Sequence, residues 1–384
     1  MCRSLFIGTC VAVWSLSTSS AMAAKRYVKT NGVTFGSCLT WGMACTLTKA
    51  MNVAVSGDEV WVKSGNYFVP VTLKNGVKIY GGFAGTETLA SQSNPVTNLT
   101  TINGGGGQAV VGDGNPSSTV LRGFRITNGN AGGDLDGGGG MALNNSSARI
   151  VQCVFQFNYA QYSGAGVAIR GTGSPYFINC DFHDNGTGTA GSGTDNNVQP
   201  LAGGAVYVKE GTPTFMNCLF HNNKAGEGAA VFNVSSMPTF VNCTFAKNYA
   251  KIGYGGAVFD AGGQGNARNS IFWDNTAIQG GNPVYCSESY PMQITYSDVQ
   301  GGWSGTGNTN SDPSFVSAGS NNYRITAVSP CIDGGIHVSP GLPVDVGDLD
   351  WDSNVSEATP LDLDRMTRVY NGAVDQGAYE IQVN

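Results

Sequence analysis

The chain has 384 residues, of which 56 are glycine; 12% of its residues are charged and 41% are hydrophobic. This composition allows a buried core but supplies few helix-favouring residues, so it predicts an all-β, turn-rich protein. The net charge is −6 and no cluster of Lys and Arg interrupts it, which argues against nucleic acid as a partner.

Residues 1–23 have the features of a secretory signal peptide. Arg3 precedes an apolar run from Leu5 to Leu16, and Ala21 to Ala23 form the small-x-small pattern that signal peptidase cleaves. A lipoprotein signal at Cys10 is the alternative, which the continuation of the apolar run past this cysteine disfavours. No other apolar segment reaches the ~18–20 residues that a membrane helix needs. We therefore expect a secreted, extracellular or periplasmic protein without a membrane span.

Eight of the ten cysteines follow this segment, and export to an oxidising compartment permits disulfides. Cys38 and Cys45 flank a short loop, and Cys286 and Cys331 stand alone toward the C-terminal region, so both pairs are candidates for disulfide bridges. The remaining four cysteines recur at one position of an internal repeat.

This repeat has a period of about 27 residues. Five segments align as VQCVFQFNYA, INCDFHDNGT, MNCLFHNNKA, VNCTFAKNYA and RNSIFWDNTA, and TYSDVQGG is a degenerate sixth copy. Spacings of 27, 38, 25, 27 and 27 residues separate the anchor positions, which are Cys153, Cys180, Cys218, Cys243, Ser270 and Ser297. An insertion between Gly186 and Ala202 accounts for the one long interval.

Each copy combines short apolar alternations with Gly and Pro and has no helical periodicity, which is typical of short strands joined by bends. Such a repeat forms one coil of a solenoid in which like residues stack on like. Phe215, Cys218 and Phe220 have equivalents in neighbouring copies and should face the core, and no CxxC or suitably spaced histidine favours zinc at the cysteines. The residues before the anchors should hydrogen-bond from coil to coil at a bend, and they are Asn179, Asn217, Asn242 and Asn269.

These motifs resemble a known family. GGAV at 203–206 and 255–258, together with FQFN, FHDN, FHNN, FAKN and FWDN, is similar to the GGA[ILV] and FxxN repeats of polymorphic membrane proteins, which are right-handed parallel β-helices. The stretch from TYSDVQGG to GAYE resembles the C-terminal module called choice-of-anchor Q in exported bacterial proteins. The resemblance implies an all-β, right-handed parallel β-helix with a short helix within Cys45–Val55 that caps its N-terminal end.

We accordingly expect a cap at 24–60, β-helix repeats at 61–302 and the C-terminal module at 303–384. Proteins with this module usually continue into a sorting or anchoring segment, whereas this chain ends four residues after GAYE. The expectation is a protein that is released, periplasmic or held by a partner.

An aromatic row is the first candidate site. Alternation after the glycine motif places two rows on opposite faces, with Val206, Val231 and Val258 on one and Tyr207, Phe232 and Phe259 on the other. If the valines point inward, the aromatic rings form an outward stack that could bind sugar rings. The interpretation that we favour is a row covered by a loop or packed at a bend.

A basic pair is the second candidate. Arg170 and Lys209 occupy the same place in successive copies, and Glu210 is adjacent. In β-helix polysaccharide lyases with a basic pair, a lysine abstracts the proton beside a uronate carboxylate and an arginine assists at the leaving oxygen. A neighbouring cation favours the neutral amine that such a base needs. We favour the alternative of a solvated pair at the coil edge.

The histidines are the third candidate. His183 and His221 also align, and Asp181 and Asp184 lie beside the first. Two imidazoles one coil apart could bind a ligand or a metal, or act as acid and base. We favour a solvated face, because the same position in other copies holds Gln156, Ala246 and Trp273.

Near the C-terminal end, DVGDLDWDSN resembles the start of a calcium loop. Its alternating carboxylates are Asp345, Asp348, Asp350 and Asp352. Ser353 replaces the turn glycine of an EF-hand, and Thr359 replaces its last glutamate. A structural calcium ion and a solvated acidic turn both remain open, and no other cofactor is predicted.

The sequence has no motif of serine hydrolases, zinc proteases or phosphate-binding loops, and Asp181 and Asp260 are too scattered for a β-helix glycosidase. It predicts a protein for extracellular recognition or adhesion that binds a polysaccharide or a surface partner. A lyase acting on uronate polymers and a passive structural component of a surface or matrix are the alternatives.

Overall fold

The computed structural model describes residues 23–132, 137–188, 201–287, 291–338 and 341–382. The predicted signal peptide therefore lies almost wholly outside the described part, as does most of the insertion after Gly186. Within the described ranges, no helix combines the length and the apolar character that a membrane crossing requires.

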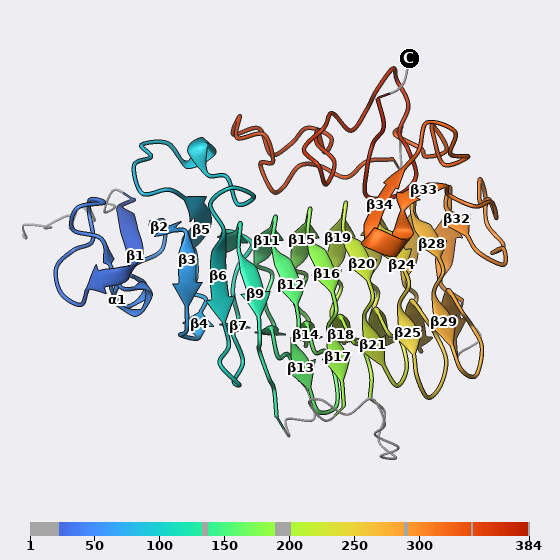
Figure 1. Cartoon of the computed structure of the whole chain (residues 1–384), viewed down its shortest axis with the longest axis horizontal. Helices are drawn as coiled ribbons and strands as arrows, with labels where there is room; N and C mark the ends of the chain where they lie inside the picture. Colours follow the sequence, from blue (N-terminus) through green and yellow to red (C-terminus); the bar gives the residue numbers. More distant parts are fainter. Residues whose placement is uncertain (1–22, 133–136, 189–200, 288–290, 339–340, 383–384) are drawn as a thin grey trace, which may run out of the picture.

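The described strands are short, and nearly all of them pair in parallel with the equivalent strand of the next coil (Figure 1). The ten-stranded sheet consists, in spatial order, of β1 (Lys25–Val33), β2 (Glu59–Lys63), β5 (Lys78–Phe83), β8 (Val120–Arg122), β11 (Arg149–Val151), β15 (Tyr176–Ile178), β19 (Thr214–Met216), β23 (Thr239–Val241), β27 (Asn266–Arg268) and β31 (Gln293–Thr295). The nine-stranded sheet consists of β3 (Gly65–Tyr67), β6 (Thr100–Asn103), β9 (Arg125–Thr127), β12 (Val154–Gln156), β16 (Asp181–His183), β20 (Leu219–His221), β24 (Thr244–Ala246), β28 (Ile271–Trp273) and β32 (Asp298–Val299).

Two further sheets complete the coils. The eight-stranded sheet consists of β4 (Val71–Thr72), β7 (Val110–Asp113), β10 (Met141–Asn144), β14 (Val167–Arg170), β18 (Val206–Lys209), β22 (Val231–Val234), β26 (Val258–Ala261) and β30 (Val284–Cys286). The five-stranded sheet consists of β13 (Tyr159–Ala160), β17 (Gly186–Thr187), β21 (Lys224–Ala225), β25 (Tyr249–Ala250) and β29 (Thr276–Ala277). The predicted all-β parallel β-helix is confirmed.

The interior is filled by rows of identical side chains. Phe220 stacks on Phe182 and on Phe245 with ring centroids 4.7 and 4.6 Å apart, and each such pair contributes about 0.5–1.5 kcal/mol beyond the burial of its area. The repeat cysteines, Cys153, Cys180, Cys218 and Cys243, are fully buried as free thiols. The predicted core rows are therefore confirmed.

A ladder of buried asparagines runs beside these rows. Asn223 donates from Nδ2 to Oδ1 of Asn248 at 2.9 Å and to the backbone oxygen of Phe182 at 2.8 Å. The same pattern links the asparagines of the FxxN motifs, which are Asn158, Asn185, Asn223, Asn248 and Asn275. Because each amide satisfies polar groups of two coils, the ladder fixes the register of the turn.

The asparagines before the anchor positions form the bend and bind the C-terminal segment. Asn179, Asn217, Asn242 and Asn269 all have φ near 50°, the left-handed region that a bend of this kind needs. Of the predicted coil-to-coil amide bonds, Asn217 to Asn179 (3.0 Å) and Asn269 to Asn242 (3.4 Å) are present. All four amides also donate to backbone oxygens of the C-terminal segment.

The glycine motif has a steric cause. Gly203 has a φ of 64°, and a Cβ at this position would lie 2.3 Å from the backbone oxygen of Val206. A side chain therefore does not fit where the chain enters β18, and this requirement recurs at Gly255 before β26.

A short helix, α1 (Leu47–Val53), covers the N-terminal end of the solenoid (Figure 1) and confirms the predicted cap. The hydroxyl of Thr46 accepts a hydrogen bond from the backbone N–H of Lys49 and so caps the helix. Leu47 and Ala50 extend the hydrophobic core past the first strands. The predicted Cys38–Cys45 disulfide is present beside this cap.

The second predicted disulfide is wrong, because Cys286 and Cys331 are both free thiols. Cys286 lies on β30 of the eight-stranded sheet, and its sulfur accepts from the backbone N–H of Met292. Cys331 packs instead with Ile271 of β28 and with Ile325. The two cysteines thus belong to different faces of the solenoid.

The C-terminal segment lies over the nine- and ten-stranded sheets (Figure 1). Its regular elements are the antiparallel strands β33 (Phe315–Ser317) and β34 (Asn322–Ile325), with a 3-10 turn at Ala318–Ser320 between them. The other 3-10 turn of the described residues, Ala90–Gln92, lies outside this segment, between β5 and β6. Leu349 packs on the outer face of the ten-stranded sheet, and Arg122 donates to the backbone oxygens of Asp348 and Leu349.

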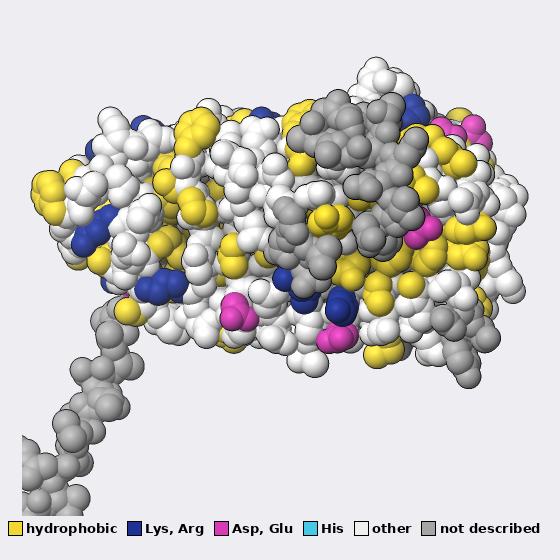
Figure 2. All heavy atoms as spheres, turned by 90° about the horizontal axis from the view of Figure 1, so that it is seen from below, with side chains coloured by type: hydrophobic (Ala, Val, Ile, Leu, Met, Phe, Trp, Pro, Cys, Tyr) yellow, Lys and Arg dark blue, Asp and Glu magenta, His cyan; other side chains and the backbone are white. Residues whose placement is uncertain are grey.

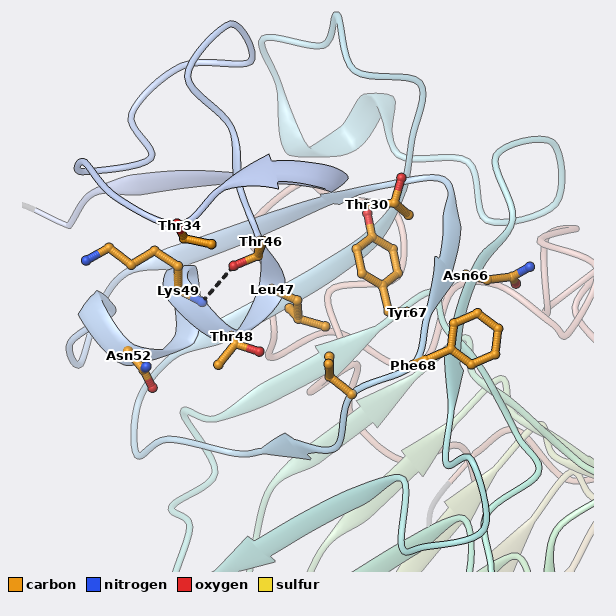
Figure 3. Close-up of a pocket in the computed structure, with 11 residues that line it drawn as sticks. Thr30, Thr34, Thr46, Leu47, Thr48, Lys49, Asn52, Asn66, Tyr67 and Phe68 are labelled. Carbon is orange, nitrogen blue, oxygen red and sulfur yellow. Dashed lines mark hydrogen bonds between the residues drawn. The ribbon is translucent and has the colours of Figure 1, made fainter.

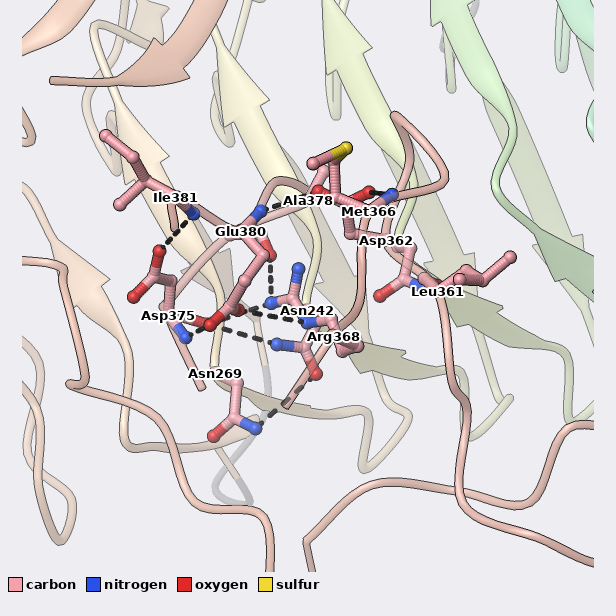
Figure 4. Close-up of polar contacts among 12 residues, drawn as sticks. Asn242, Asn269, Leu361, Asp362, Met366, Arg368, Asp375, Ala378, Glu380 and Ile381 are labelled. Atoms are coloured by element: carbon pink, nitrogen blue, oxygen red, sulfur yellow. Dashed lines mark hydrogen bonds and ion pairs between the residues drawn. The ribbon is translucent and has the colours of Figure 1, made fainter. Parts of the chain in front are cut away.

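A buried polar cluster holds the last loops together (Figure 4). Arg368 is fully buried, donates to the backbone oxygens of Asp375 and Gly377, and lies 3.8 Å from the carboxylate of Glu380. The carboxylates of Asp362, Asp375 and Glu380 accept backbone N–H groups from one another's loops. The segment is therefore tied internally by the charge-assisted hydrogen bonds of Arg368 and by the hydrogen bonds of these three carboxyl groups.

Candidate functional site

The predicted aromatic stack forms, but two of its rings are buried. Tyr207, Phe232 and Phe259 occupy equivalent positions on β18, β22 and β26, and Phe232 lies 4.8 Å from Phe259. Phe232 and Phe259 are each 8% exposed, in a cluster with Ala202 and the partly buried Tyr207. Figure 2, the view from below, shows hydrophobic side chains gathered over the later coils. The favoured interpretation of a covered row thus describes this stack better than an open sugar-binding one.

The predicted basic pair is side by side. Arg170 and Lys209 are register partners on β14 and β18, and the guanidinium of Arg170 donates to the backbone oxygen of Gly137. Lys209 and Glu210 are exposed. Lys209 therefore lacks the burial that would help to make a lysine a base.

The histidines differ from the predicted solvated face. His183 of β16 and His221 of β20 stack with ring centroids 4.8 Å apart and an interplanar angle of 14°. His221 is 4% exposed, because Tyr323 of the C-terminal segment covers it at 5.0 Å. His183 Nδ1 lies 2.8 Å from a carboxylate oxygen of Asp184. Burial lowers the pKa of His183, but this hydrogen bond and the charges of Asp181 and Asp184 together outweigh it, so that the pKa is raised.

An open hollow of about 250 Å³ lies next to this pair on the outer surface. Its lining combines exposed aromatic rings with amide, carboxylate and ammonium groups, and it consists of Phe157, Tyr159, Asp184, Asn185, Gly186, Asn222 and Lys224. Phe157 is 46% exposed and Tyr159 is 38% exposed. The bend places these side chains outward, since Phe157, Asp184 and Asn222 share a positive φ at the same point of successive coils.

The hollow opens onto the outer row of the five-stranded sheet. The alanines of this sheet, Ala160, Ala225, Ala250 and Ala277, point inward. The alternate positions point outward in register, and they are Tyr159, Gly186, Lys224, Tyr249 and Thr276. Tyr249 is 38% exposed, like Tyr159. Analysis of the sequence missed this row, although Tyr-Ala after the FxxN motif in two copies was a signal for it.

The acidic loop gathers the predicted carboxylates in two groups. Oxygens of Asp348, Asp350 and Asp352 form one, and oxygens of Asp345, Asp350 and Glu357 form the other, with all ligand atoms of each group within 4.8 Å of one another. Burial, together with the charges of Asp350 and Asp348, raises the pKa of Asp345 to about 6. Glu357 was not predicted, because it falls two positions before the last ligand of the EF-hand pattern.

This second group fits a hard cation better than a solvated turn. Asp345 is fully buried, and Oε1 of Glu357 is buried without a hydrogen-bond partner among the described residues. A calcium ion takes such carboxylate oxygens as ligands. Asp345, Asp350 and Glu357 would hold it in a loop that Arg122 already fixes to the solenoid.

A larger hollow of about 560 Å³ lies at the N-terminal cap (Figure 3). Threonine and asparagine side chains from α1 and the neighbouring strands surround it, and Phe68 is its one strongly exposed aromatic ring among the lining residues. This hollow is separate from the outward row of the five-stranded sheet. It can therefore serve as a control for experiments on that row.

Comparisons with known proteins bear on the fold. Residues 136–290 and 187–338 match the family model described as "Right handed beta helix region", so that more than half of the chain is covered and the predicted handedness is confirmed. No curated protein matches the sequence significantly. Among solved structures, the chain is similar to the "Crystal structure of pectate lyase Pel9A", with 15% identity, 94% of this chain and 97% of that chain covered, and a TM-score of 0.47. A likeness at that level says nothing about activity.

Proposed function

The chain belongs to the right-handed β-helix family, and we propose that it is an exported recognition protein that binds a polysaccharide along its five-stranded sheet. The observation that carries this proposal is the exposed row with Tyr159, Lys224 and Tyr249, which leads into the hollow beside Phe157. The resemblance to polymorphic membrane protein repeats and to the choice-of-anchor Q module supports an extracellular setting.

The chemistry of the hollow suits sugars. Aromatic faces pack against the C–H surface of a sugar ring, while amide and carboxylate groups accept and donate hydrogen bonds to its hydroxyls. Phe157 and Tyr159 supply the rings, and Asp184 and Asn222 supply the polar groups. Lys224 adds a cation that would favour a glycan with acidic substituents.

The repeat spaces the side chains of the row evenly along the solenoid axis, which suits the binding of a polymer. Coils are about 4.8 Å apart, so Tyr159 and Tyr249, which are three coils apart, are separated by about 14 Å along the axis. Gly186 lies between them on the row, and among the described residues a Cβ there would meet only the backbone oxygen of Lys224, at 3.6 Å. A chain molecule lying along the solenoid can therefore contact both tyrosines.

Glycan-array binding and affinity electrophoresis test this proposal. Tyr159→Ala and Tyr249→Ala should each weaken binding about tenfold, the value of one aromatic contact of about 1–1.5 kcal/mol. Gly186→Leu should block the hollow without removing any group. Phe68→Ala is the matched control, since it removes an aromatic ring that is even more exposed, at 69%, from the N-terminal hollow. Unchanged binding in a folded Tyr159→Ala/Tyr249→Ala double variant would show that the row is not the site.

A polysaccharide lyase is the second candidate, and the register pairing of Arg170 with Lys209 favours it. Incubation with alginates, pectates and glycosaminoglycans would then produce the ultraviolet absorbance of an unsaturated product, and Lys209→Ala would abolish it. No absorbance change with any of these polymers rules the lyase out. If the protein also binds no glycan, the passive structural role remains.

A further inference from the structure

Three metal-ligating side chains meet on the outer face of the nine-stranded sheet. Asp181 and His183 are two residues apart on β16, so both point outward, and His221 is the register partner of His183 on β20. One ligand atom from each of the three lies within 4.8 Å of the other two. Small rotations of the side chains bring such atoms to a shared cation. The rigid sheet fixes the backbone positions from which these side chains extend.

The first imidazole is oriented for this purpose by a neighbour. Nδ1 of His183 is 2.8 Å from Oδ2 of Asp184, which leaves Nε2 of His183 directed elsewhere. Metal-bound histidines almost always donate their second ring N–H to a carboxylate or carbonyl, and the Asp184–His183 pair has this arrangement.

The carboxylate of Asp181 lacks the partners that a buried oxygen normally has. Its Oδ1 is buried and makes no hydrogen bond to any described residue, although Nε2 of His221 is 3.4 Å away. A buried polar atom without a partner is uncommon and requires a physical reason. A cation bound between Asp181, His183 and His221 would be the missing partner of this oxygen.

The surroundings strengthen the interaction with a cation. The ring of Tyr323 covers His221, and the Tyr323 hydroxyl is itself buried without a partner among the described residues. Nδ1 of His221 lies 3.1 Å from Nδ2 of Asn222, which also donates to Oδ1 of Asn321 at 2.9 Å. When both amides are turned over, Asn321 donates to the oxygen of Asn222 and this oxygen faces His221, so that Nδ1 can donate and Nε2 is released for a metal. Exclusion of water by Tyr323 raises the electrostatic contribution of each ligand.

We propose that Asp181, His183 and His221 form a binding site for a divalent transition metal ion of the zinc class. Two imidazoles and a carboxylate are ligands that zinc prefers, and three protein ligands leave a coordination position for water or another small ligand. A groove of about 210 Å³, lined by Asp181 together with Leu363, Arg365 and Tyr379 of the C-terminal segment, reaches the site. The proposal does not depend on glycan binding.

Titration of the chelator-treated full chain with Zn²⁺ and Co²⁺ tests the site. We expect one ion per chain by calorimetry, and a visible Co²⁺ spectrum typical of nitrogen and oxygen ligands. His221→Ala, His183→Ala and Asp181→Asn should abolish this binding, and Asp184→Asn should weaken it about 10–100-fold as a positioning residue. His337→Ala is the matched control, because it removes the exposed third histidine, outside the cluster, and should leave binding unchanged.

Three results would overturn the proposal. One is no stoichiometric binding of either ion by the folded protein, checked by circular dichroism. Another is a thiolate-to-cobalt charge-transfer band, which would place the ion on cysteines. The third is binding that survives His221→Gln but is lost in Asp350→Asn, which would place it in the acidic loop.

Discussion

Asn217 donates from its side-chain amide to the backbone oxygen of Leu361 at 2.8 Å, across 144 residues of sequence. Asn242 and Asn269 do the same to Asp375 and Ile336. One asparagine at the bend therefore adopts the left-handed backbone conformation that the bend needs, and its side chain holds the C-terminal segment against the solenoid. The coils and the segment are joined at every repeat in this region.

Replacing Asn217 should separate these two contributions. Asn217→Ala leaves the partly buried carbonyl of Leu361 unpaired and puts alanine in the left-handed region, which it disfavours, so the free energy of unfolding should fall by about 2–4 kcal/mol. Asn217→Gly keeps the backbone conformation and loses only the amide, so it should cost about 1–2 kcal/mol. Guanidinium denaturation of both variants measures the difference. Stability of Asn217→Ala equal to that of the unaltered protein would show that the contact is not stabilising.

The thiols should behave as core residues in the native protein. Burial raises the pKa of Cys218 far above its ordinary value, and Cys153 is raised for the same reason. Iodoacetamide at pH 8 should therefore leave the repeat cysteines unmodified until the protein is unfolded, while the half-buried Cys286 reacts first. Peptide mass spectrometry provides the readout. A peptide that links Cys286 to Cys331 would contradict the structure.

The repeat made most of the solenoid predictable. Because like residues stack on like, one period was enough to place the Phe and Cys rows in the core and the valines opposite the aromatic rings. The FxxN asparagine was visible in five copies, yet the ladder was expected at the asparagine before the anchor, which only four copies have. Both positions recur along the solenoid, and the geometry of the two bends decides which of them forms the continuous ladder.

The candidate sites were less predictable, because they depend on the part of the chain that has no period. His221 was expected to be solvated, and Tyr323 covers it from the C-terminal segment. Arg122 likewise finds its backbone acceptor at Leu349, 227 residues later. A segment without regular periodicity gives no signal for which face of a solenoid it will cover.

Calcium should stabilise the acidic loop if Asp345, Asp350 and Glu357 hold it as proposed. Saturating Ca²⁺ at about 100 times its dissociation constant adds about 2.7 kcal/mol to the free energy of unfolding. A chelator should remove this gain, and Asp350→Asn should abolish it because it removes a ligand shared by both carboxylate groups. Differential scanning calorimetry with and without Ca²⁺ makes the measurement, with Asp113→Asn as a control on an exposed strand end. An equal midpoint under both conditions would leave the solvated acidic turn as the description of the loop.

The cluster around Arg368 should make stability depend on pH. Burial raises the pKa of Glu380 from an ordinary 4.5 to about 8, although the charge of Arg368 opposes this, and Asp375 and Asp362 reinforce it. Between these two values the folded protein holds a proton that the unfolded chain releases. The free energy of unfolding should therefore fall as the pH rises through this window, because the folded state binds more protons than the unfolded one.

Glu380→Gln provides the decisive comparison, because the amide keeps an acceptor for the backbone N–H of Asp375 and cannot ionise. Thermal midpoints at pH 5.5 and 8.5 should differ less in this variant than in the unaltered protein. A residual slope of the same sign is expected, since burial also raises the pKa values of Asp362 and Asp375. Asp113→Asn, which removes an exposed carboxylate far from the cluster, should keep the full slope. A midpoint that rises with pH in the unaltered protein would mean that Glu380 is ionised in the fold and that Arg368 outweighs the cost of its burial.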